Sequence, residues 1–468
     1  MSDASGWASH QYFESTEPQM SLDGGTTSAG PLWHAVSSRW GHSMHALCSY
    51  QGMFPPKLAH YFIQKYSDPG QTILDPFSGR GTTTLQARVE GRVAIGNDLS
   101  PLAFVLSKAK ATPPSWSDLE AYVCQLEVEY SQCVFKTNTV SPDISMLFDP
   151  DTLNQLLFLR QRLQERRPTQ WNRLDVMLAA GVAGILHGAT RGDGSSSYLS
   201  ISMPNTFSMS PNYVRRYIHE KGLVPPKQNV FSRLLDKLAI QYLDATDGPD
   251  GKTFHSDAVA LLSRKDMSQA VDLIITSPPY MKVVNYGTAN WIRLWWLGID
   301  DVSTHTGSGR RQLDARLDHG HGYAMYEEFM QRVLRGIEYS LAPGGVAVVV
   351  IGDVAEPGGV SVPLAWNVWK AIEPQSGLGL LDFIEDDVAE QNKVSRIWGE
   401  TRGQATNRDC ILILNRQGES PNISHSAINW EEPYRDAGPD AAHSRVQKRR
   451  QSIRRIPPLD GRDDDVGF

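Results

Sequence analysis

Cysteine is scarce in this chain of 468 residues, and its few cysteines are scattered. They are Cys48, Cys124, Cys133 and Cys410, and no two form a CxxC pair, so the sequence offers neither a disulfide framework nor a zinc motif. It also lacks an apolar run of about 18 residues and the basic-then-apolar start of a signal peptide. We therefore expect reduced thiols, no metal, no membrane partner and a soluble, cytoplasmic protein.

Positive net charge is missing as well. The chain has 45 Lys and Arg against 52 Asp and Glu, a net charge of −7, so it is not a polycation that holds nucleic acid indiscriminately. Any nucleic-acid binding must come from local basic patches. The length predicts roughly two or three domains of about 150 residues each.

The pattern between residues 54 and 100 predicts a βαβ unit. Residues 54–66 have helical spacing, and a turn at 69–71 leads into a short apolar strand at 72–77. A helix at 82–91 and a second strand at 92–100 follow. A strand, turn, helix and strand within about 30 residues imply a parallel sheet.

Helical patterns then replace the strands until about residue 250, beginning with a helix for which Ser117 and Glu120 form a predicted capping box. Apolar β-branched runs resume near residues 252, 271, 341 and 409, which indicates one sheet interrupted by a helical insertion. The expected divisions are an N-terminal arm (1–45), a first core part (46–111), the insertion (112–250), a second core part (251–416) and a C-terminal tail (417–468), which we expect to be flexible.

The segment 75–84, DPFSGRGTTT, carries the first chemical signal, because glycines at a strand end let the backbone approach a ligand. It lacks the lysine of a P-loop and the third glycine of a dinucleotide motif. Taken alone, the two glycines are better explained by an ordinary turn that needs positive φ angles.

Two further features accompany this loop. Asp98 closes the second strand, where a carboxylate can accept hydrogen bonds from ribose hydroxyls, although it is also a common turn residue. Residues 276–280, TSPPY, directly follow the apolar strand VDLII. Successive prolines stop a strand and leave its carbonyls free to bind a ligand. Both features are predicted at the carboxyl edge of one sheet, where ligands bind in such folds.

Residues 75–82 and 277–280 together resemble the cofactor and catalytic motifs of amino-methylating DNA methyltransferases, which use S-adenosylmethionine to methylate cytosine N4 or adenine N6. The resemblance implies an α/β fold of the Rossmann-like class I methyltransferase type, with a doubly wound, mainly parallel sheet. The spelling SPPY resembles the cytosine-N4 branch, since adenine enzymes more often have an acidic or amide residue in place of Ser277. The insertion departs from the family pattern and suggests either a target-recognition domain or a helical support.

Site residues follow from the resemblance. The implied catalytic residues are Ser277, Pro278, Pro279 and Tyr280. The implied cofactor-binding residues are Phe54, Pro55, Asp75, Pro76, Phe77, Gly79, Gly81, Thr82, Asp98, Leu99 and Asp257. Acceptors at Ser277 Oγ and the Pro278 carbonyl would take the amino protons of the base, while Tyr280 stacks on its ring. Methylation at a ring carbon is disfavoured, because it needs a cysteine nucleophile, typically after proline, and no cysteine here follows one.

A base inside a duplex cannot reach such a site, so we expect DNA as the partner with its target base flipped out. The candidate DNA-binding residues are Arg191, Arg215 and Arg216 around the insertion's loop, and Arg310, Arg311 and Arg316 in a predicted loop at 304–322. For each arginine a solvated surface position is an equally good interpretation. The enzyme would act beside a restriction endonuclease or leave a stand-alone mark.

The aromatic run after the catalytic turn has two interpretations. Asn285, Tyr286 and Asn290 are candidates for the cofactor or base pocket, whereas Ile292, Leu294, Trp295 and Trp296 fit the core face of a helix.

Three alternatives to cytosine-N4 methylation remain open on the sequence. They are adenine-N6 methylation, an RNA base methyltransferase with a similar loop and proline-tyrosine turn, and a regulator that binds S-adenosylmethionine without catalysis.

Overall fold

The computed structural model describes residues 26–27, 30–37, 40–52, 54–133, 140–192, 194–279, 285–303, 308–317, 322–355, 361–387 and 405–432. A sheet with the strand order β5-β4-β3-β6-β7-β10-β9 forms its centre, and β8 pairs with β7 outside this path. The strands are β3 (Thr72–Asp75), β4 (Val93–Asn97), β5 (Lys252–Phe254), β6 (Val271–Thr276), β7 (Leu341–Ala355), β8 (Ser361–Val362), β9 (Leu378–Asp387) and β10 (Ala405–Arg416). A separate two-stranded sheet joins β1 (Thr26–Thr27) and β2 (Gly30–Pro31).

The strand directions define the fold. Strands β5, β4, β3, β6 and β7 are mutually parallel, whereas β10 runs antiparallel to both β7 and β9. Apolar runs such as VDLIIT in β6 suit these central strands, because helices cover both faces of a parallel sheet. The predicted doubly wound, mainly parallel α/β sheet is confirmed.

The strand order reverses between β3 and β6. After β3 the chain adds β4 and β5 on one side, and β6 and β7 continue the sheet on the other side. Helices leave β3 and β6 towards different faces at such a point, so a crevice opens beyond the carboxyl ends of these two strands.

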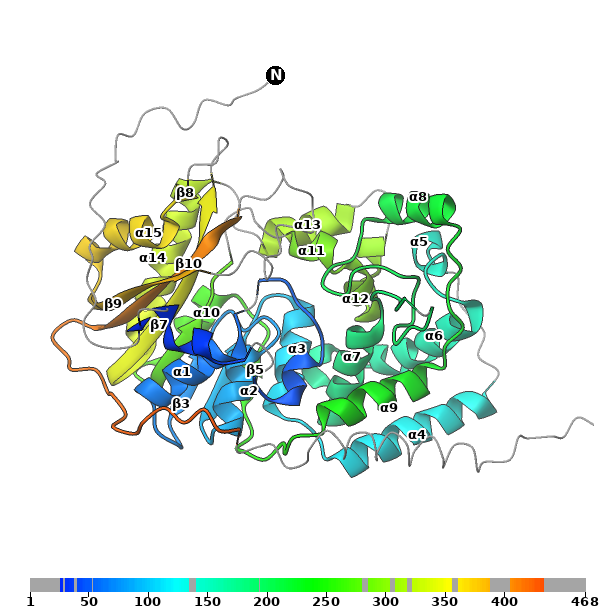
Figure 1. Ribbon diagram of the computed structural model, residues 1–468, viewed down its shortest axis with the longest axis horizontal. Coiled ribbons are helices and arrows are strands. Elements are labelled where there is room, and N and C mark those ends of the chain that lie inside the picture. The colour runs from blue at the N-terminus through cyan, green and yellow to red at the C-terminus, as the bar shows by residue number, and fades with distance from the viewer. Residues whose placement is uncertain are drawn as a thin grey trace, which may run out of the picture.

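Helices pack on both faces of the sheet (Figure 1). One buried cluster joins the sheet to α10 (Ala258–Leu262), α14 (Tyr323–Ser340) and α15 (Leu364–Ile372). A second cluster joins the opposite face to α1 (Pro56–Tyr66). The crossover helix α2 (Thr82–Val89) and α3 (Pro101–Ala111) complete the predicted βαβ region, which is confirmed.

A lobe of helices lies beside the sheet (Figure 1). Its members from the insertion are α4 (Trp116–Gln132), α5 (Pro142–Ser145), α6 (Pro150–Gln164), α7 (Arg173–Ile185), α8 (Pro211–Lys221) and α9 (Val230–Gln241). They share one buried cluster with α3 and with α12 (Trp291–Trp296), so the insertion and the sheet domain are joined by common packing. The boundaries that we drew for the domains stay a prediction.

Two local predictions can be compared with this lobe. Ile292, Leu294, Trp295 and Trp296 are at most 2% exposed, which confirms them as a core face. The capping box at Ser117 is wrong: α4 begins at Trp116, and Ser115 Oγ accepts from the Asp118 amide at 3.1 Å. The helix starts there because Pro113 and Pro114 keep the preceding backbone extended.

The remaining helices are α11 (Tyr286–Ala289), α13 (Ser308–Leu317) and the 3₁₀ helices η1 (Leu32–Ala35), η2 (Ser43–Ala46), η3 (Pro168–Gln170), η4 (Lys265–Met267), η5 (Asp300–Ser303) and η6 (Glu373–Gln375). Helix α13 corrects the loop expected at 304–322: its residues Arg310 to Leu317 include no helix breaker. Within the described ranges, no helix combines the length and apolar character that crossing a membrane requires.

Candidate active site

A buried hydrogen bond joins the ends of β3 and β6. Thr276 Oγ1 donates to Asp75 Oδ1 at 2.7 Å, and the amide of Phe77 donates to the same oxygen at 3.2 Å. Asp75 is only 2% exposed, and burial raises the pKa of its carboxyl to about 7 despite these donors. This hydrogen bond therefore fixes the glycine loop after β3 and the proline turn after β6 next to each other at their first residues.

The glycine loop is fixed by its backbone conformation and by hydrogen bonds to the Asp98 carboxylate. Gly79 and Gly81 have φ angles of +49° and +77°, a region in which other residues are strained. The Gly79 amide donates to Asp98 Oδ2 at 2.9 Å, and the Ser100 amide donates to Asp98 Oδ1 at 2.8 Å. Asp98 thus connects the loop after β3 to the one after β4.

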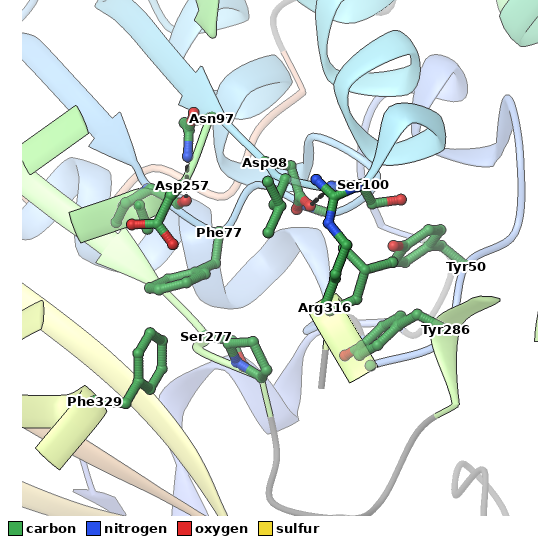
Figure 2. Close-up of a pocket in the computed structure, with 17 residues that line it drawn as sticks. Tyr50, Phe77, Asn97, Asp98, Ser100, Asp257, Ser277, Tyr286, Arg316 and Phe329 are labelled. Carbon is green, nitrogen blue, oxygen red and sulfur yellow. Dashed lines mark hydrogen bonds between the residues drawn. The ribbon is translucent and has the colours of Figure 1, made fainter. Parts of the chain in front are cut away.

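A pocket lies beyond these strand ends (Figure 2). Its volume is about 610 Å³ when the open solvent at its mouth is counted. The residues that line it are Tyr50, Gly52, Pro76, Phe77, Gly79, Asn97, Asp98, Leu99, Ser100, Asp257, Ala258, Ser277, Pro279, Tyr286, Arg316, Leu317 and Phe329. Both sequence motifs therefore contribute to one cavity.

Aromatic pairs form two of its walls. Phe77 meets Phe329 of α14 edge-on, with ring centroids 5.9 Å apart at 72°. Tyr50 stacks on Tyr286 of α11, with centroids 6.0 Å apart at 27°. These rings offer flat apolar faces to a heteroaromatic ligand.

Carboxylates supply the charge of the pocket. Burial raises the pKa of Asp98 to about 6, and the amides of Ser100 and Gly79 oppose the shift by stabilising the anion. Asp257 caps α10 by accepting from the Ala260 amide at 3.1 Å. Arg316 of α13 reaches the same pocket (Figure 2). Within the described ranges, no group of three or more His, Cys, Asp or Glu side chains is arranged to hold a metal ion.

The predicted cofactor residues divide into two groups. Those that line the pocket are Pro76, Phe77, Gly79, Asp98, Leu99 and Asp257. Asp75, Gly81 and Thr82 do not line it: Asp75 binds Thr276, while Gly81 and Thr82 begin helix α2. Pro55 is the N-cap residue of α1, and Phe54 packs against the cluster that contains this helix, so neither reaches the pocket.

The structure describes three of the four catalytic candidates. Ser277 and Pro279 line the pocket, whereas Pro278 is buried and does not line it. Tyr280 lies outside the described residues. Tyr286, a candidate from the sequence, lines the same pocket. The other candidate, Asn290, is buried and accepts from Arg293 at 3.2 Å instead.

Several lining residues escaped the sequence analysis. They are Tyr50, Gly52, Asn97, Ser100, Ala258, Leu317 and Phe329. Asn97, Ser100 and Ala258 flank predicted residues, so their neighbours could have indicated them. Phe329 comes from a helix far along the chain, and no local pattern connects it with the motifs.

The six arginines differ in their surroundings. Arg316 lines the pocket, and all six except Arg310 are exposed. Arg310 is only 9% exposed and donates to the Val302 carbonyl at 2.5 Å. Arg215 forms an ion pair with Asp143. Arg215 and Arg310 thus have partners within the protein.

Known proteins share parts of this sequence. A family model described as DNA methylase matches residues 15–108, which include the glycine loop and Asp98. The type II methyltransferase M.MjaII of Methanocaldococcus jannaschii is 37% identical over 67 residues, 14% of this chain and 13% of that protein. The type II methyltransferase M.MvaI of Kocuria varians is 24% identical over 277 residues, 55% of this chain and 58% of that protein. M.BsoBI of Geobacillus stearothermophilus is 26% identical over 277 residues, 55% of this chain and 53% of that protein.

The last two matches span little more than half the length of the curated relatives, and the first far less. Among solved structures, the rRNA methyltransferase aviRa from Streptomyces viridochromogenes is 12% identical over 79% of this chain and 89% of that chain, with a TM-score of 0.27. The fold assignment rests on the sheet order rather than on this weak likeness.

The strand order, the antiparallel β10 and the pocket at the switch point define a Rossmann-like fold of the class I methyltransferase type. Within that class, the family match and the type II relatives confirm the resemblance to the S-adenosylmethionine-dependent amino-methylating DNA methyltransferases.

Proposed function

We propose that this protein transfers the methyl group of S-adenosylmethionine to the exocyclic N4 amino group of cytosine in DNA. One observation carries the proposal: Gly79 of the cofactor motif and Ser277 of the catalytic motif line the same pocket. The bond between Asp75 and Thr276 keeps their two loops adjacent. A methyl group can pass directly between two ligands only when their sites share such a cavity.

The residues of the pocket fit the cofactor. Gly79 has a φ of +49°, which favours glycine, and a Cβ there would meet Tyr50 at an ordinary contact distance of 3.7 Å. The carboxylates of Asp98 and Asp257 suit ribose hydroxyls and a cationic ligand, and aromatic rings also attract cations. When bound, the cofactor supplies an activated methyl group on a sulfonium, so transfer breaks a carbon–sulfur bond and forms a carbon–nitrogen bond.

The turn after β6 would hold the amine. The lone pair of an exocyclic amino group is delocalised into the ring, so the amine needs acceptors that draw its protons away and aim the nitrogen. Ser277 Oγ and the Pro278 carbonyl are assigned this role, with Tyr280 stacking on the base. The sulfur keeps the electron pair of the broken bond and leaves as S-adenosylhomocysteine, and the methylated amine would release one proton to solvent along its hydrogen bond to Ser277 Oγ. No covalent intermediate with the protein is required.

The choice of cytosine rests on Ser277, which stands where adenine enzymes more often have an acidic or amide residue. The base is proposed to flip out of the duplex into the pocket. Arg316 at the pocket and the exposed Arg191, Arg216 and Arg311 are assigned to the DNA backbone. The similarity to type II methyltransferases supports a restriction-modification role. A cognate endonuclease as partner and a cytoplasmic location are part of the same proposal.

Isotope-labelled cofactor provides the test. Purified protein is incubated with duplex DNA of mixed sequence, and the nucleosides are separated by mass spectrometry. Labelled N4-methylcytosine is expected, and the Ser277→Ala and Asp98→Asn variants should produce much less of it. Labelled N6-methyladenine alone would overturn the assignment of the base. Label in transfer or ribosomal RNA, with none in DNA, would overturn the assignment of the nucleic acid, and cofactor binding without any transfer would indicate a regulator.

A further inference from the structure

Helix α8 presents an aromatic and basic surface to solvent. Tyr213 is 47% exposed, and its ring stacks on that of Tyr217 with centroids 6.1 Å apart at 19°. The guanidinium carbon of Arg216 lies 5.9 Å from the centre of the Tyr213 ring. The helix carries Arg215, Arg216 and Lys221 against the single acidic residue Glu220, in a chain whose net charge is −7. Packing alone does not explain this surface.

The start of α8 is tied to the active-site wall. The Ser208 amide donates to the carbonyl of Ala289 at 2.5 Å, and Trp291 Nε1 donates to the carbonyl of Met209 at 2.8 Å. Ala289 ends α11, whose first residue, Tyr286, lines the pocket. Helix α8 begins directly after these contacts, so its position is linked to that of the pocket wall.

A buried carboxylate connects α8 to α5. Asp143 of α5 is 2% exposed and pairs with Arg215 of α8. Arg310 of α13 also has a partner, because it donates to the Val302 carbonyl at 2.5 Å. Figure 1 shows α8, α5, α11 and α13 along the same edge of the molecule. Since Arg215 and Arg310 have partners within the protein, Arg216 is the more available contact on α8.

We propose that the exposed face of α8 binds the DNA duplex beside the flipped base, with Arg216 and Lys221 on phosphates and Tyr213 against a sugar or base edge. The inference rests on the proposed function and names the surface that holds the flanking DNA. A duplex extending from a base at Ser277 would cross the edge that carries α13 and α8. Basic side chains there would attract its phosphates, and an exposed tyrosine ring provides a flat face for a sugar or base.

Binding of a fluorescent 40-base-pair duplex pool of random sequence, measured by anisotropy over a series of salt concentrations, tests the surface. Tyr213→Ala and Arg216→Ala should each raise Kd about fivefold or more. Arg216→Ala should also reduce the slope of log Kd against log salt by about one. The matched control is Tyr339→Ala with Arg335→Ala on α14, since Tyr339 is also exposed, at 41%. This control should leave Kd and the salt slope unchanged.

The outcomes separate the two proposals. Titration calorimetry with S-adenosylhomocysteine checks that each variant keeps an intact pocket. If wild-type protein methylates DNA and the α8 variants bind the duplex as tightly as wild type, this inference alone is overturned. If wild-type protein neither binds nor methylates DNA, the proposed function fails as well. Loss of affinity for structured RNA, with unchanged affinity for the duplex, would overturn DNA as the occupant of α8.

Discussion

Asp314 of α13 accepts a 2.6 Å hydrogen bond from the hydroxyl of Thr288 on α11. Its other oxygen accepts from the amides of Gly287 and Thr288, at 2.7 and 3.1 Å. One side chain therefore caps the short helix that bears Tyr286 and joins it to the helix that bears Arg316. Both of those residues line the pocket, so Asp314 acts as a positioning residue for one wall.

Replacing Asp314 with alanine should reduce methyl transfer more than it reduces stability. The loss of a cap costs about 0.5–2 kcal/mol, whereas displacement of α11 and α13 would move Tyr286 and Arg316 together. We expect kcat/KM to fall at least tenfold, with KM for DNA and kcat measured separately. Gln312→Ala, an exposed change on the same helix, should be neutral. An Asp314 variant with unchanged kinetics would show that α11 keeps its position without this cap.

Three glycines with positive φ angles can be compared, of which Gly79 and Gly81 belong to the glycine loop and Gly70 precedes β3. A Cβ at Gly81 would lie 2.8 Å from Ser107 Cα, whereas Gly70, with a similar φ of +89°, has open space around it. Gly70→Ala should therefore cost only the strain of its backbone, about 1–2 kcal/mol, and Gly81→Ala should cost clearly more. Gly79→Ala, which faces the pocket, should chiefly weaken cofactor binding. Chemical denaturation and calorimetry measure the two effects, and equal destabilisation at residues 70 and 81 would refute the close contact.

Local sequence signals predicted much of the framework. The strand that ends at Asp75, the glycine loop and the strand that ends near Asp98 were recognisable because their apolar runs and turn residues lie close together in the chain. The core face of α12 followed from the same reasoning. These elements are encoded by the spacing of apolar residues along the chain, and the core that they form buries those same residues.

Other features depend on contacts between distant segments. Tyr50 and Phe329 reach the pocket from positions about 280 residues apart, and neither lies near a motif. Asp75 resembled a ligand-binding residue, yet its partner is Thr276, 201 positions away. Arg310 looked like a surface cation, yet it is buried and donates to a carbonyl, and the exposed Arg215 pairs with a buried aspartate. Which polar group meets which is decided by packing, and a single sequence does not contain that information.

Cofactor affinity should depend on pH through Asp98. Burial raises the pKa of this carboxyl to about 6, and a cationic, hydroxyl-bearing ligand binds its ionised form better. Affinity for S-adenosylmethionine should therefore fall as pH decreases below about 6, by at most tenfold per pH unit. Asp98→Asn should bind more weakly and show a flatter pH profile. Because this variant keeps Asp75, which titrates near pH 7, the difference between the two profiles isolates Asp98, and parallel profiles would exclude it.

Stability should also depend on pH, through Asp75. Burial raises its folded pKa from 3.8 to about 7, so the folded state holds a proton that the unfolded chain releases. The stabilising contribution is complete below about pH 4 and is lost as pH rises to about 7, with a slope of at most about 1.4 kcal/mol per unit. Urea denaturation between pH 4 and 8 should reveal this decline, and Asp75→Asn, which keeps an acceptor for Thr276, should remove it.

Thr276→Val extends the same test. The change removes a donor to the buried carboxylate, which matters most when Asp75 is ionised, so the variant should lose about 1–3 kcal/mol at pH 8 and less at pH 5. Thr253→Val on the edge strand β5, which is separated from β3 by β4, is the control and should show no such dependence on pH. Because the same bond holds the two motif loops together, methyl transfer by Thr276→Val should fall even where the protein remains folded. Equal destabilisation at both pH values would mean that Thr276 does not stabilise the ionised form of Asp75.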